Sequence, residues 1–224
     1  MKKIIIITIL LITSLDFLYS QRIDTTYYNK KDQRVSRKKY CYYRVASQDS
    51  DRVKVFDYFK SGSIKMSGAY TSFDFSKEIG PFCYYSKNAI KQIEVHQPSL
   101  YPEIYNKFKN YIDKIPKQPD SLKLIITFYK NNSIYGIGYA SECCFWYGPW
   151  YYFTKKGEPM IMYTYQFNNL DGPFVWFINY KPIIKGEYKN NKKDGKWLYY
   201  DNKEKIIKIL IYKDGKVVER YYVS

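Results

Sequence analysis

The sequence has few of the residues on which most enzyme active sites depend. Among 224 residues there is one histidine, His96, which follows a short apolar stretch without a second ligand at metal-binding spacing. We therefore expect neither a metal ligand nor a general base at His96. No nucleophile elbow, phosphate loop or dinucleotide fingerprint occurs. The sequence predicts no catalytic residue, no cofactor and no metal site.

Long hydrophobic runs are missing after the first 20 residues. Two lysines precede the apolar run Ile4–Ile12, which is too short to span a bilayer, and Ser20 ends the segment. This pattern predicts a signal peptide over residues 1–20 with cleavage before Gln21. An uncleaved N-terminal anchor is the alternative. We expect an exported protein that is periplasmic, envelope-associated or secreted, with no transmembrane segment left after signal removal.

Cysteine is also scarce. The chain has four: Cys41, Cys83, Cys143 and Cys144. In an exported protein they could form two disulfides, for which three connectivities exist. Adjacent Cys143 and Cys144 rarely bridge each other, and Cys83 occupies a repeat position that holds Val175 or Leu198 elsewhere, as a buried thiol would. The sequence leaves the disulfide state open.

Acidic residues are few relative to basic ones. The chain has 21 acidic and 37 basic residues, a net charge of +16 that is spread along the sequence. Codon bias of an AT-rich genome and a selected basic surface both explain this excess. A selected surface would suit an anionic polymer or another protein as partner; we expect no nucleic acid.

Aromatic residues, in contrast, are abundant and periodic. They make up 20% of the chain, and one pattern recurs: Gly, then Lys or Pro, a large aromatic residue, any residue, and two aromatics. The copies begin at Gly80, Gly148, Gly172 and Gly195, and the last three are 24 and 23 residues apart. A fixed period of this length indicates a repeat protein built from one small unit.

Each unit is interpreted as a β-hairpin. In the last one, Trp197–Tyr200 is a short aromatic strand, polar residues follow, and Ile206–Tyr212 is a β-branched second strand. Asp-Gly pairs at 171–172 and 194–195 are expected to form turns, so Asp171, Asp194 and Asp214 are turn formers and not catalytic carboxylates. A single hairpin is marginally stable and must stack on neighbours.

Six units are expected, starting near residues 53, 80, 123, 148, 172 and 195. In five of them a turn position suited to a left-handed residue is identified, where the sequence has Gly62, Asn132, Gly157, Ala89 and Glu204. Gly and Asn fit this conformation, whereas Ala89 and Glu204 depart from it.

The pattern Gly-x-Tyr, Lys-Lys-Asp-Gly-Lys-Trp, Tyr-Tyr over Gly186–Tyr200 resembles the variant MORN repeat. The chain is similar to proteins named YwqK-family antitoxins, common as secreted or periplasmic proteins of Bacteroidota. The resemblance covers roughly residues 53–218 and is most specific at 172–218. It implies a run of antiparallel β-hairpins and, from the family name, neutralisation of a toxin. The repeat motif itself carries no catalytic residues.

The remaining segments fit around the hairpins. Residues 21–52, basic at 30–31 and 37–39, are expected to cap the 53–224 repeat domain, or alternatively to form a basic arm for an anionic partner. The period is interrupted at about 97–121, where apolar residues at helical spacing predict an amphipathic helix over 102–115. We expect this helix to cover one face of the sheet; a membrane-surface or partner helix is the alternative.

The fold class is therefore mostly β: an antiparallel sheet of stacked β-hairpin repeats with one inserted helix. Alternation puts Trp197 and Tyr199 on one face, and recurrence of Trp150, Trp176 and Trp197 with the repeat favours packing. A single layer cannot hide both faces, so some Tyr rings should be exposed beside Lys. We expect an exported, non-enzymatic scaffold that binds another macromolecule through a Tyr/Lys-rich face. Toxin neutralisation is the alternative, and an unrecognised enzyme the third.

Overall fold

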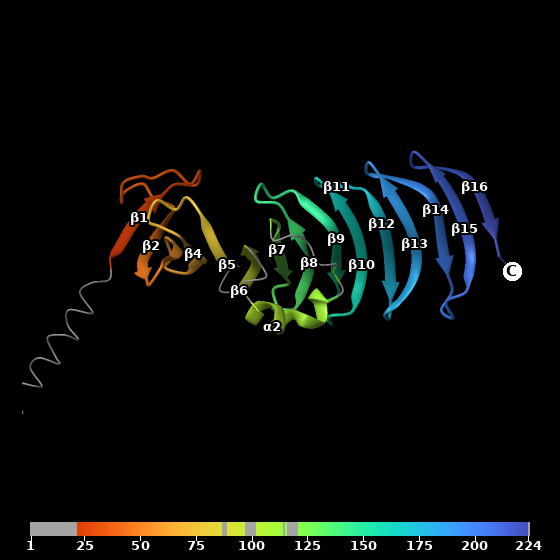
Figure 1. The fold of residues 1–224 in the computed structure, drawn as a ribbon, viewed down its shortest axis with the longest axis horizontal. Helices are drawn as coiled ribbons and strands as arrows, with labels where there is room; N and C mark the ends of the chain where they lie inside the picture. Colours follow the sequence, from red (N-terminus) through yellow and green to blue (C-terminus); the bar gives the residue numbers. More distant parts are fainter. Residues whose placement is uncertain (1–21, 87–88, 97–101, 114, 116–120, 224) are drawn as a thin grey trace, which may run out of the picture. The chain divides into compact units, whose positions relative to one another are not determined.

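A computed structural model describes residues 22–86, 89–96, 102–113, 115 and 121–223 (Figure 1). The predicted signal peptide and its cleavage site lie outside these residues. The chain divides into two compact units between Ile79 and Gly80. Among the described residues, no helix combines the length and hydrophobicity that crossing a membrane requires.

The first unit is an antiparallel sheet in which neighbouring strands follow the chain order: β1 (Ile23–Tyr28), β2 (Tyr42–Asp49), β3 (Arg52–Phe59) and β4 (Ile64–Tyr70). Val53 and Val55 are fully buried. Arg44 of β2 lies opposite Asp57 of β3, and its guanidinium donates to both carboxylate oxygens at 2.7 and 3.0 Å. Aromatic rings surround this buried pair. The two hydrogen bonds satisfy both charges and help to fix the register of β2 and β3.

The second unit repeats the hairpin. Its strands also pair antiparallel in chain order, and β11 (Asn169–Leu170) forms a short additional pairing with β10. The strands in this order are β5 (Glu78–Ser86), β6 (Ala89–His96), β7 (Lys123–Phe128), β8 (Ile134–Ala140), β9 (Trp146–Phe153), β10 (Pro159–Gln166), β12 (Gly172–Ile178), β13 (Lys181–Lys189), β14 (Lys192–Tyr200), β15 (Ile206–Lys213) and β16 (Lys216–Tyr222). The predicted fold class, mostly β with consecutive hairpins, is confirmed.

One helix, α2 (Pro102–Ile112), lies in the predicted insertion. Phe108 and Ile112 of this helix pack into a buried cluster with Ile126 of β7 and Ile137 of β8. The helix prediction is confirmed, although the helix ends at Ile112, three residues earlier than expected, and has non-helical backbone angles at Phe108. It supplies a second layer over part of the sheet.

The glycine that opens a repeat forms a bulge and not a turn, so that prediction is wrong for Asp194–Gly195. Both residues lie inside β14, where Asp194 pairs with Glu187 and Gly195 has φ +63°. The turn before β14 is Asn190–Asn191, with φ values of 50° and 64°. Two consecutive left-handed residues match the twist of a hairpin, and asparagine accepts them readily.

The other Asp-Gly pairs differ from each other. Asp214–Gly215 forms a two-residue turn between β15 and β16, with φ values of 50° and 83°. Asp171–Gly172 does not, because the turn lies earlier, at Phe167–Asn168, and Gly172 already belongs to β12. The dipeptide therefore marks a turn only where a two-residue loop is needed.

The left-handed turn residues are placed as predicted at Gly62, Asn132, Gly157 and Glu204, with φ between 62° and 86°. The prediction for Ala89 is wrong, because Ala89 lies in β6 and pairs with Ser86. A further copy occurs in the expected cap. Asp32 has φ 57°, and Asn29 accepts backbone N–H bonds from residues 31 and 33, as Asp201 does from residues 203 and 205.

Candidate functional site

One face of the second unit carries a continuous series of aromatic rings, called here the aromatic face. Its central contacts join Tyr163 to Phe174 at 5.2 Å, Phe174 to Trp197 at 5.0 Å, and Trp197 to Tyr212 at 5.6 Å between ring centroids. Two of these contacts join neighbouring strands, and the contact of Phe174 with Trp197 crosses the intervening β13, so the rings are linked across the sheet. The aromatic face comprises Trp146, Trp150, Tyr152, Tyr163, Tyr165, Phe174, Tyr188, Trp197, Tyr199 and Tyr212.

The bulge glycines explain how the indole rings are placed. Three residues, Gly195 to Trp197, face the single Gly186 of β13, so the Trp197 ring lies on the Gly186 backbone. A Cβ atom on Gly186 would be 2.3 Å from that ring. The indole N–H donates to the carbonyl of Glu187 at 3.2 Å, and Trp197 is 1% exposed. Its predicted burial is confirmed.

The same arrangement occurs one region earlier. Trp150 lies on Gly138 of β8, where a Cβ would again be 2.3 Å from the ring, and its indole N–H donates to the Tyr139 carbonyl at 2.9 Å. In the intervening unit, Phe174 holds this position. Trp176 does not, and it is 41% exposed, so the packing expected for it is wrong. The aromatic that packs is the one two residues after the bulge glycine.

Positive charges lie among these rings. Lys193 Nζ is 4.1 Å from the centre of the Trp197 ring, and Lys208 Nζ is 4.0 Å from that of Tyr199. Pairing with Leu210 places Arg220 on the same face. Cations over ring faces are attracted by the ring quadrupole. In the described strands β13–β16, strand pairing puts no carboxylate on this face, whereas Glu187 and Asp194 point to the opposite one.

Three phenols of the aromatic face, those of Tyr163, Tyr188 and Tyr199, remain neutral at physiological pH. Burial raises the pKa of Tyr163 and Tyr188, and it raises the pKa of Tyr199, together with a hydrogen bond to Tyr212, to about 12. A neutral hydroxyl both donates and accepts hydrogen bonds. The face therefore combines fixed rings, neutral hydroxyls and cations, which can bind a partner but have no obvious nucleophile.

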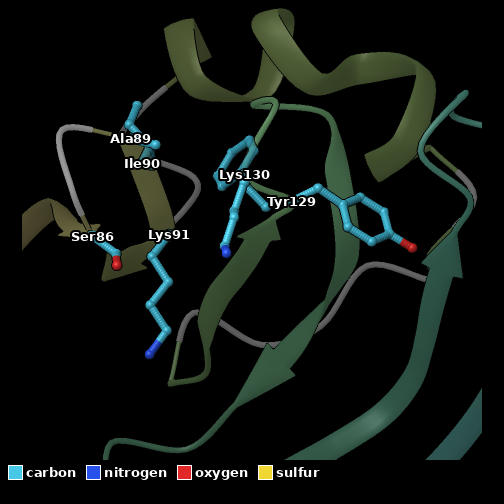
Figure 2. A pocket seen from close by; sticks show the side chains of 7 residues that line it. Ser86, Ala89, Ile90, Lys91, Tyr129 and Lys130 are labelled. Carbon is cyan, nitrogen blue, oxygen red and sulfur yellow. The ribbon is translucent and has the colours of Figure 1, made fainter.

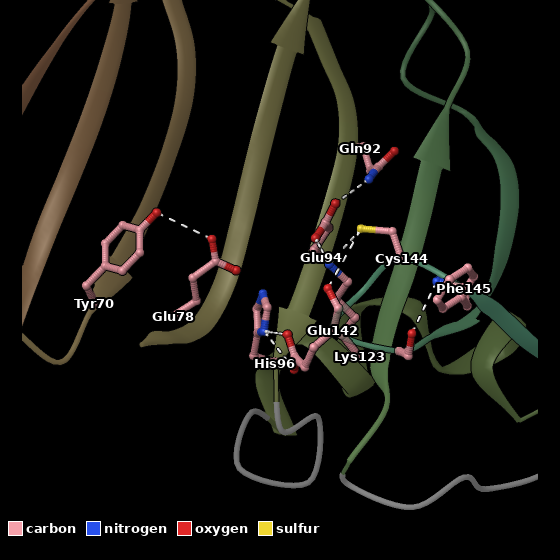
Figure 3. A network of polar contacts seen from close by, with 10 residues as sticks. Tyr70, Glu78, Gln92, Glu94, His96, Lys123, Glu142, Cys144 and Phe145 are labelled. Atoms are coloured by element: carbon pink, nitrogen blue, oxygen red, sulfur yellow. Dashed lines mark hydrogen bonds and ion pairs between the residues drawn. The ribbon is translucent and has the colours of Figure 1, made fainter. Parts of the chain in front are cut away.

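A second cluster is polar and lies at β6 and β7 (Figure 3). Lys123 Nζ donates to Glu94 at 2.7 Å and lies 3.5 Å from the Cys144 sulfur. Lys123 and Glu94 are 4% and 8% exposed. Burial lowers the pKa of Lys123, but the hydrogen bond and charge of Glu94 outweigh it, so the pKa is raised. Lys123 stays protonated and is unsuited to act as a base or an amine nucleophile.

His96 has a partner that the sequence did not indicate. Its Nδ1 lies 3.1 Å from a carboxylate oxygen of Glu142, 46 residues later in the chain (Figure 3). His96 is buried at the end of β6, and Glu142 is exposed in the loop after β8. No local spacing signals this pair, because the order of the strands alone brings the two segments together.

No disulfide joins the four cysteines, all of which lie among the described residues. Cys83 packs against the cluster under α2, as its repeat position indicated, while Cys143 and Cys144 are exposed in the loop before β9.

A hollow of about 330 Å³ lies beside β6 and the end of β7 (Figure 2). Ile90 and Phe128 form part of its apolar lining, and Lys91 and Lys130 extend to the same side of it. Specific small-molecule sites also need convergent polar groups, and this lining offers two flexible ammonium groups beside two hydroxyls. The hollow therefore does not define a catalytic or cofactor site.

Comparisons with known proteins add no assignment. No protein-family model matches the chain, and a search of curated proteins found no match. The resemblance to variant MORN repeats therefore rests on the sequence pattern described above.

Proposed function

We propose that this chain is an exported, non-enzymatic repeat scaffold that binds another macromolecule, a protein or an anionic polymer, through the aromatic face. The observation that carries the proposal is the composition of that face: contiguous rings with Lys193, Lys208 and Arg220 among them and, over the described strands β13–β16, no carboxylate pointing to that side. The central rings are buried, but others on this face are exposed, Trp146 to 37%, and exposed apolar patches mark interaction sites. The resemblance to secreted repeat proteins supports the same function.

The geometry favours a broad contact. Most rings pack on each other and are therefore already ordered, so little side-chain entropy is lost when a partner binds. Two further rings that strand pairing places on this face, Trp176 and Tyr222, are 41% and 76% exposed. Aromatic and Arg side chains are the residues that dominate binding energy at protein interfaces.

A pair of double variants tests the proposal. Lys193→Glu with Lys208→Glu reverses charge on the aromatic face of β14 and β15, whereas Lys185→Glu with Lys196→Glu makes the same change on the opposite face of β13 and β14. Immobilised chain is incubated with envelope extract, and the captured partner is quantified. We expect loss of capture only with the first pair.

The salt dependence of capture then identifies the contact. A partner held by lysines should dissociate at high salt, because exposed charges are screened beyond about 8 Å at physiological ionic strength. A partner held by rings should resist salt but be lost with Tyr199→Ala. Equal loss with both double variants would show that overall charge, and not the face, retains the partner.

Toxin neutralisation, which the resemblance implies, is the second candidate. It requires a neighbouring gene whose product is lethal alone and harmless when co-expressed with this chain. If rescue survives Lys193→Glu with Lys208→Glu, the aromatic face is not the neutralising surface.

A further inference from the structure

A second surface with binding character lies in the first unit. A hollow of about 450 Å³ opens between β1–β2 and the turn that follows β3. Its lining includes Tyr27, Arg37, Tyr40, Tyr43 and Lys60. The volume is within the roughly 300–1,000 Å³ of ligand pockets. Arg37 belongs to the basic segment 37–39, for which the sequence left open an arm for an anionic partner as an alternative to a cap.

The tyrosines form a fixed wall. Tyr27 and Tyr43 are directly paired across β1 and β2, and Tyr40 contacts both, with ring centroids 5.2 and 6.1 Å away. Behind them, Tyr43 stacks on Tyr58 at 5.2 Å. The Cys41 backbone N–H donates to the Tyr28 carbonyl at 2.7 Å, which holds the loop carrying Tyr40 beside β1. The wall is therefore ordered before any ligand arrives.

The charges of the hollow are all positive. Arg37 and Lys60 line it, Lys60 Nζ lies 5.5 Å from the Tyr40 ring centre, and the lining contains no carboxylate. Within the described residues, neither cation has a carboxylate within 4.0 Å. Other cations of this unit are paired: Arg44 with Asp57 at 2.7 Å and Lys65 with Asp32 at 3.6 Å.

Arg37 and Lys60 line the same hollow without a carboxylate, so a negatively charged ligand in it would be attracted by both. Arginine offers a planar fork of N–H donors that matches a carboxylate, and lysine adds a point charge. The Thr25 and Ser61 side chains supply hydroxyls at the same surface. The hollow thus combines anion recognition, hydroxyl recognition and aromatic ring surface.

We propose that this hollow binds a carboxylate-bearing sugar residue of an acidic polysaccharide. The C–H groups of a pyranose ring carry partial positive charge and pack on the negative face of a tyrosine ring. The carboxylate then reaches Arg37 and Lys60, and the sugar hydroxyls bond to Thr25, Ser61 and the phenols. A nucleic-acid base could also stack on these rings, but the Thr25 and Ser61 hydroxyls and the three phenols offer more partners to a polyhydroxylated ring. Binding of an oligonucleotide is therefore one arm of the test.

The test measures binding of tetragalacturonate to the purified full chain by calorimetry. Tetragalactose, which has hydroxyls but no carboxylates, is the matched ligand control, and inorganic phosphate and a short oligothymidylate are the other probes. We expect tetragalacturonate to bind and tetragalactose to bind at least about tenfold more weakly, since each lost charge-assisted hydrogen bond is worth about one decade or more.

Variants then locate the site. Arg37→Gln and Lys60→Gln should each weaken tetragalacturonate binding about tenfold, whereas Lys38→Gln, which removes the same charge from the adjacent residue outside the lining, should leave it unchanged. Tyr40→Leu should weaken binding of the acidic sugar with an unchanged melting temperature of the chain.

Four outcomes would overturn the proposal: no binding of tetragalacturonate, equal affinity for phosphate, tighter binding of oligothymidylate, or equal effects of Lys38→Gln and Arg37→Gln. The double variant Lys193→Glu with Lys208→Glu should leave sugar binding intact, so failure of this inference is separate from failure of the aromatic-face proposal.

Discussion

The second unit contains two regions that stabilise the same hairpin in different ways. Under α2, in β6–β9, aliphatic residues such as Ile126 and Ile137 are fully buried between sheet and helix. In β12–β16 no described helix covers the sheet, and the buried cluster consists of Phe174, Trp197 and Leu210 with half-buried rings around it. A small aliphatic side chain needs a second layer to be buried, whereas a large ring lying along the sheet is buried by its neighbours.

This difference explains where the repeat is clearest. In the open region the buried contacts lie among rings of strands that are adjacent or one strand apart, so each unit needs a bulge glycine and a packed aromatic residue such as Phe174 or Trp197. In the helix-covered region α2 supplies contacts that the hairpins do not share, and Cys83 and Ile137 belong to the cluster that packs there. The repeat pattern is therefore strongest at residues 172–218.

Alkaline pH should separate the two regions most strongly. The pKa of Tyr199 is raised to about 12, and those of Tyr163 and Tyr188 are also raised. Their contribution is complete below the ordinary tyrosine pKa of about 10 and is lost as pH rises through the folded pKa values, since only the unfolded chain ionises readily. Burial also raises the pKa of Tyr152 on β9 and of Tyr165 on β10. Hydrogen exchange between pH 9 and 12 should therefore show β9, β10, β13 and β14 losing protection before β6–β8. Simultaneous opening of β6–β8 would contradict this.

Trp197→Ala should destabilise the open region by about 3–5 kcal/mol, because the buried indole and its hydrogen bond are both lost. Since repeats couple to their nearest neighbours, the loss of protection should stay within β12–β16. Thermal melting with hydrogen exchange measures both. An unchanged melting temperature together with lost partner binding would make Trp197 a contact residue.

Ile126→Ala should lower the free energy of unfolding by about 2–5 kcal/mol, and it should act on the helix-covered region β6–β9. The side chain is fully buried between β7 and α2, so its removal leaves an enclosed cavity. Urea unfolding should show loss of helix signal together with β6–β9. If only β12–β16 weakens, the division into two regions is wrong.

Gly186→Ala should cost about 1–3 kcal/mol through overpacking, because the new methyl group would lie 2.3 Å from the Trp197 ring. Gly195→Ala is the matched control: no atom lies within 4 Å of its Cβ position, and only its φ of +63° opposes alanine. The wavelength of maximum Trp fluorescence emission should shift to the red for Gly186→Ala and stay unchanged for Gly195→Ala.

Glu204→Gly should have the smallest effect, a gain of up to about 1 kcal/mol. Glu204 has φ +62° at the position that holds Gly62 and Gly157 in other units, and glycine accepts this conformation without steric cost. The exposed ion pair with Lys181 at 3.5 Å is lost, but such pairs contribute little. A fall in melting temperature would show that the ion pair outweighs the backbone strain.

The features that could be predicted from the sequence are those that depend on nearby residues. The hairpins, the helix and the left-handed turn residues follow from local propensity and periodicity. The bulge at Gly195 could not be predicted, because it requires knowing that three residues face Gly186 on another strand. A turn was assigned instead, and the true turn at Asn190–Asn191 carries no glycine.

The candidate surfaces show the same limit. The predicted Tyr/Lys character of the sheet face followed from alternation along single strands. The pairs Glu94–Lys123 and His96–Glu142 join residues 29 and 46 positions apart. The hollow around Tyr43 gathers residues from Thr25 to Gly62. Such placements depend on strand order and loop path, which composition and period do not encode. The hairpin turn at Asn29–Gln33 was the exception: its Tyr-Tyr-Asn opening matches Tyr-Tyr-Asp at 199–201 and was detectable.

The stacking of Trp146 on Trp150, with centroids 4.5 Å apart and planes 24° from parallel, gives the molecule an internal optical reporter. Two indole transitions this close couple as an exciton pair and produce a circular-dichroism couplet in the ultraviolet. The other two tryptophans, Trp176 and Trp197, stand on later strands and contribute emission without sharing this couplet. During unfolding of one sample, the circular-dichroism couplet therefore reports on β9, at the border of the helix-covered region, and the Trp emission reports on the open sheet as well.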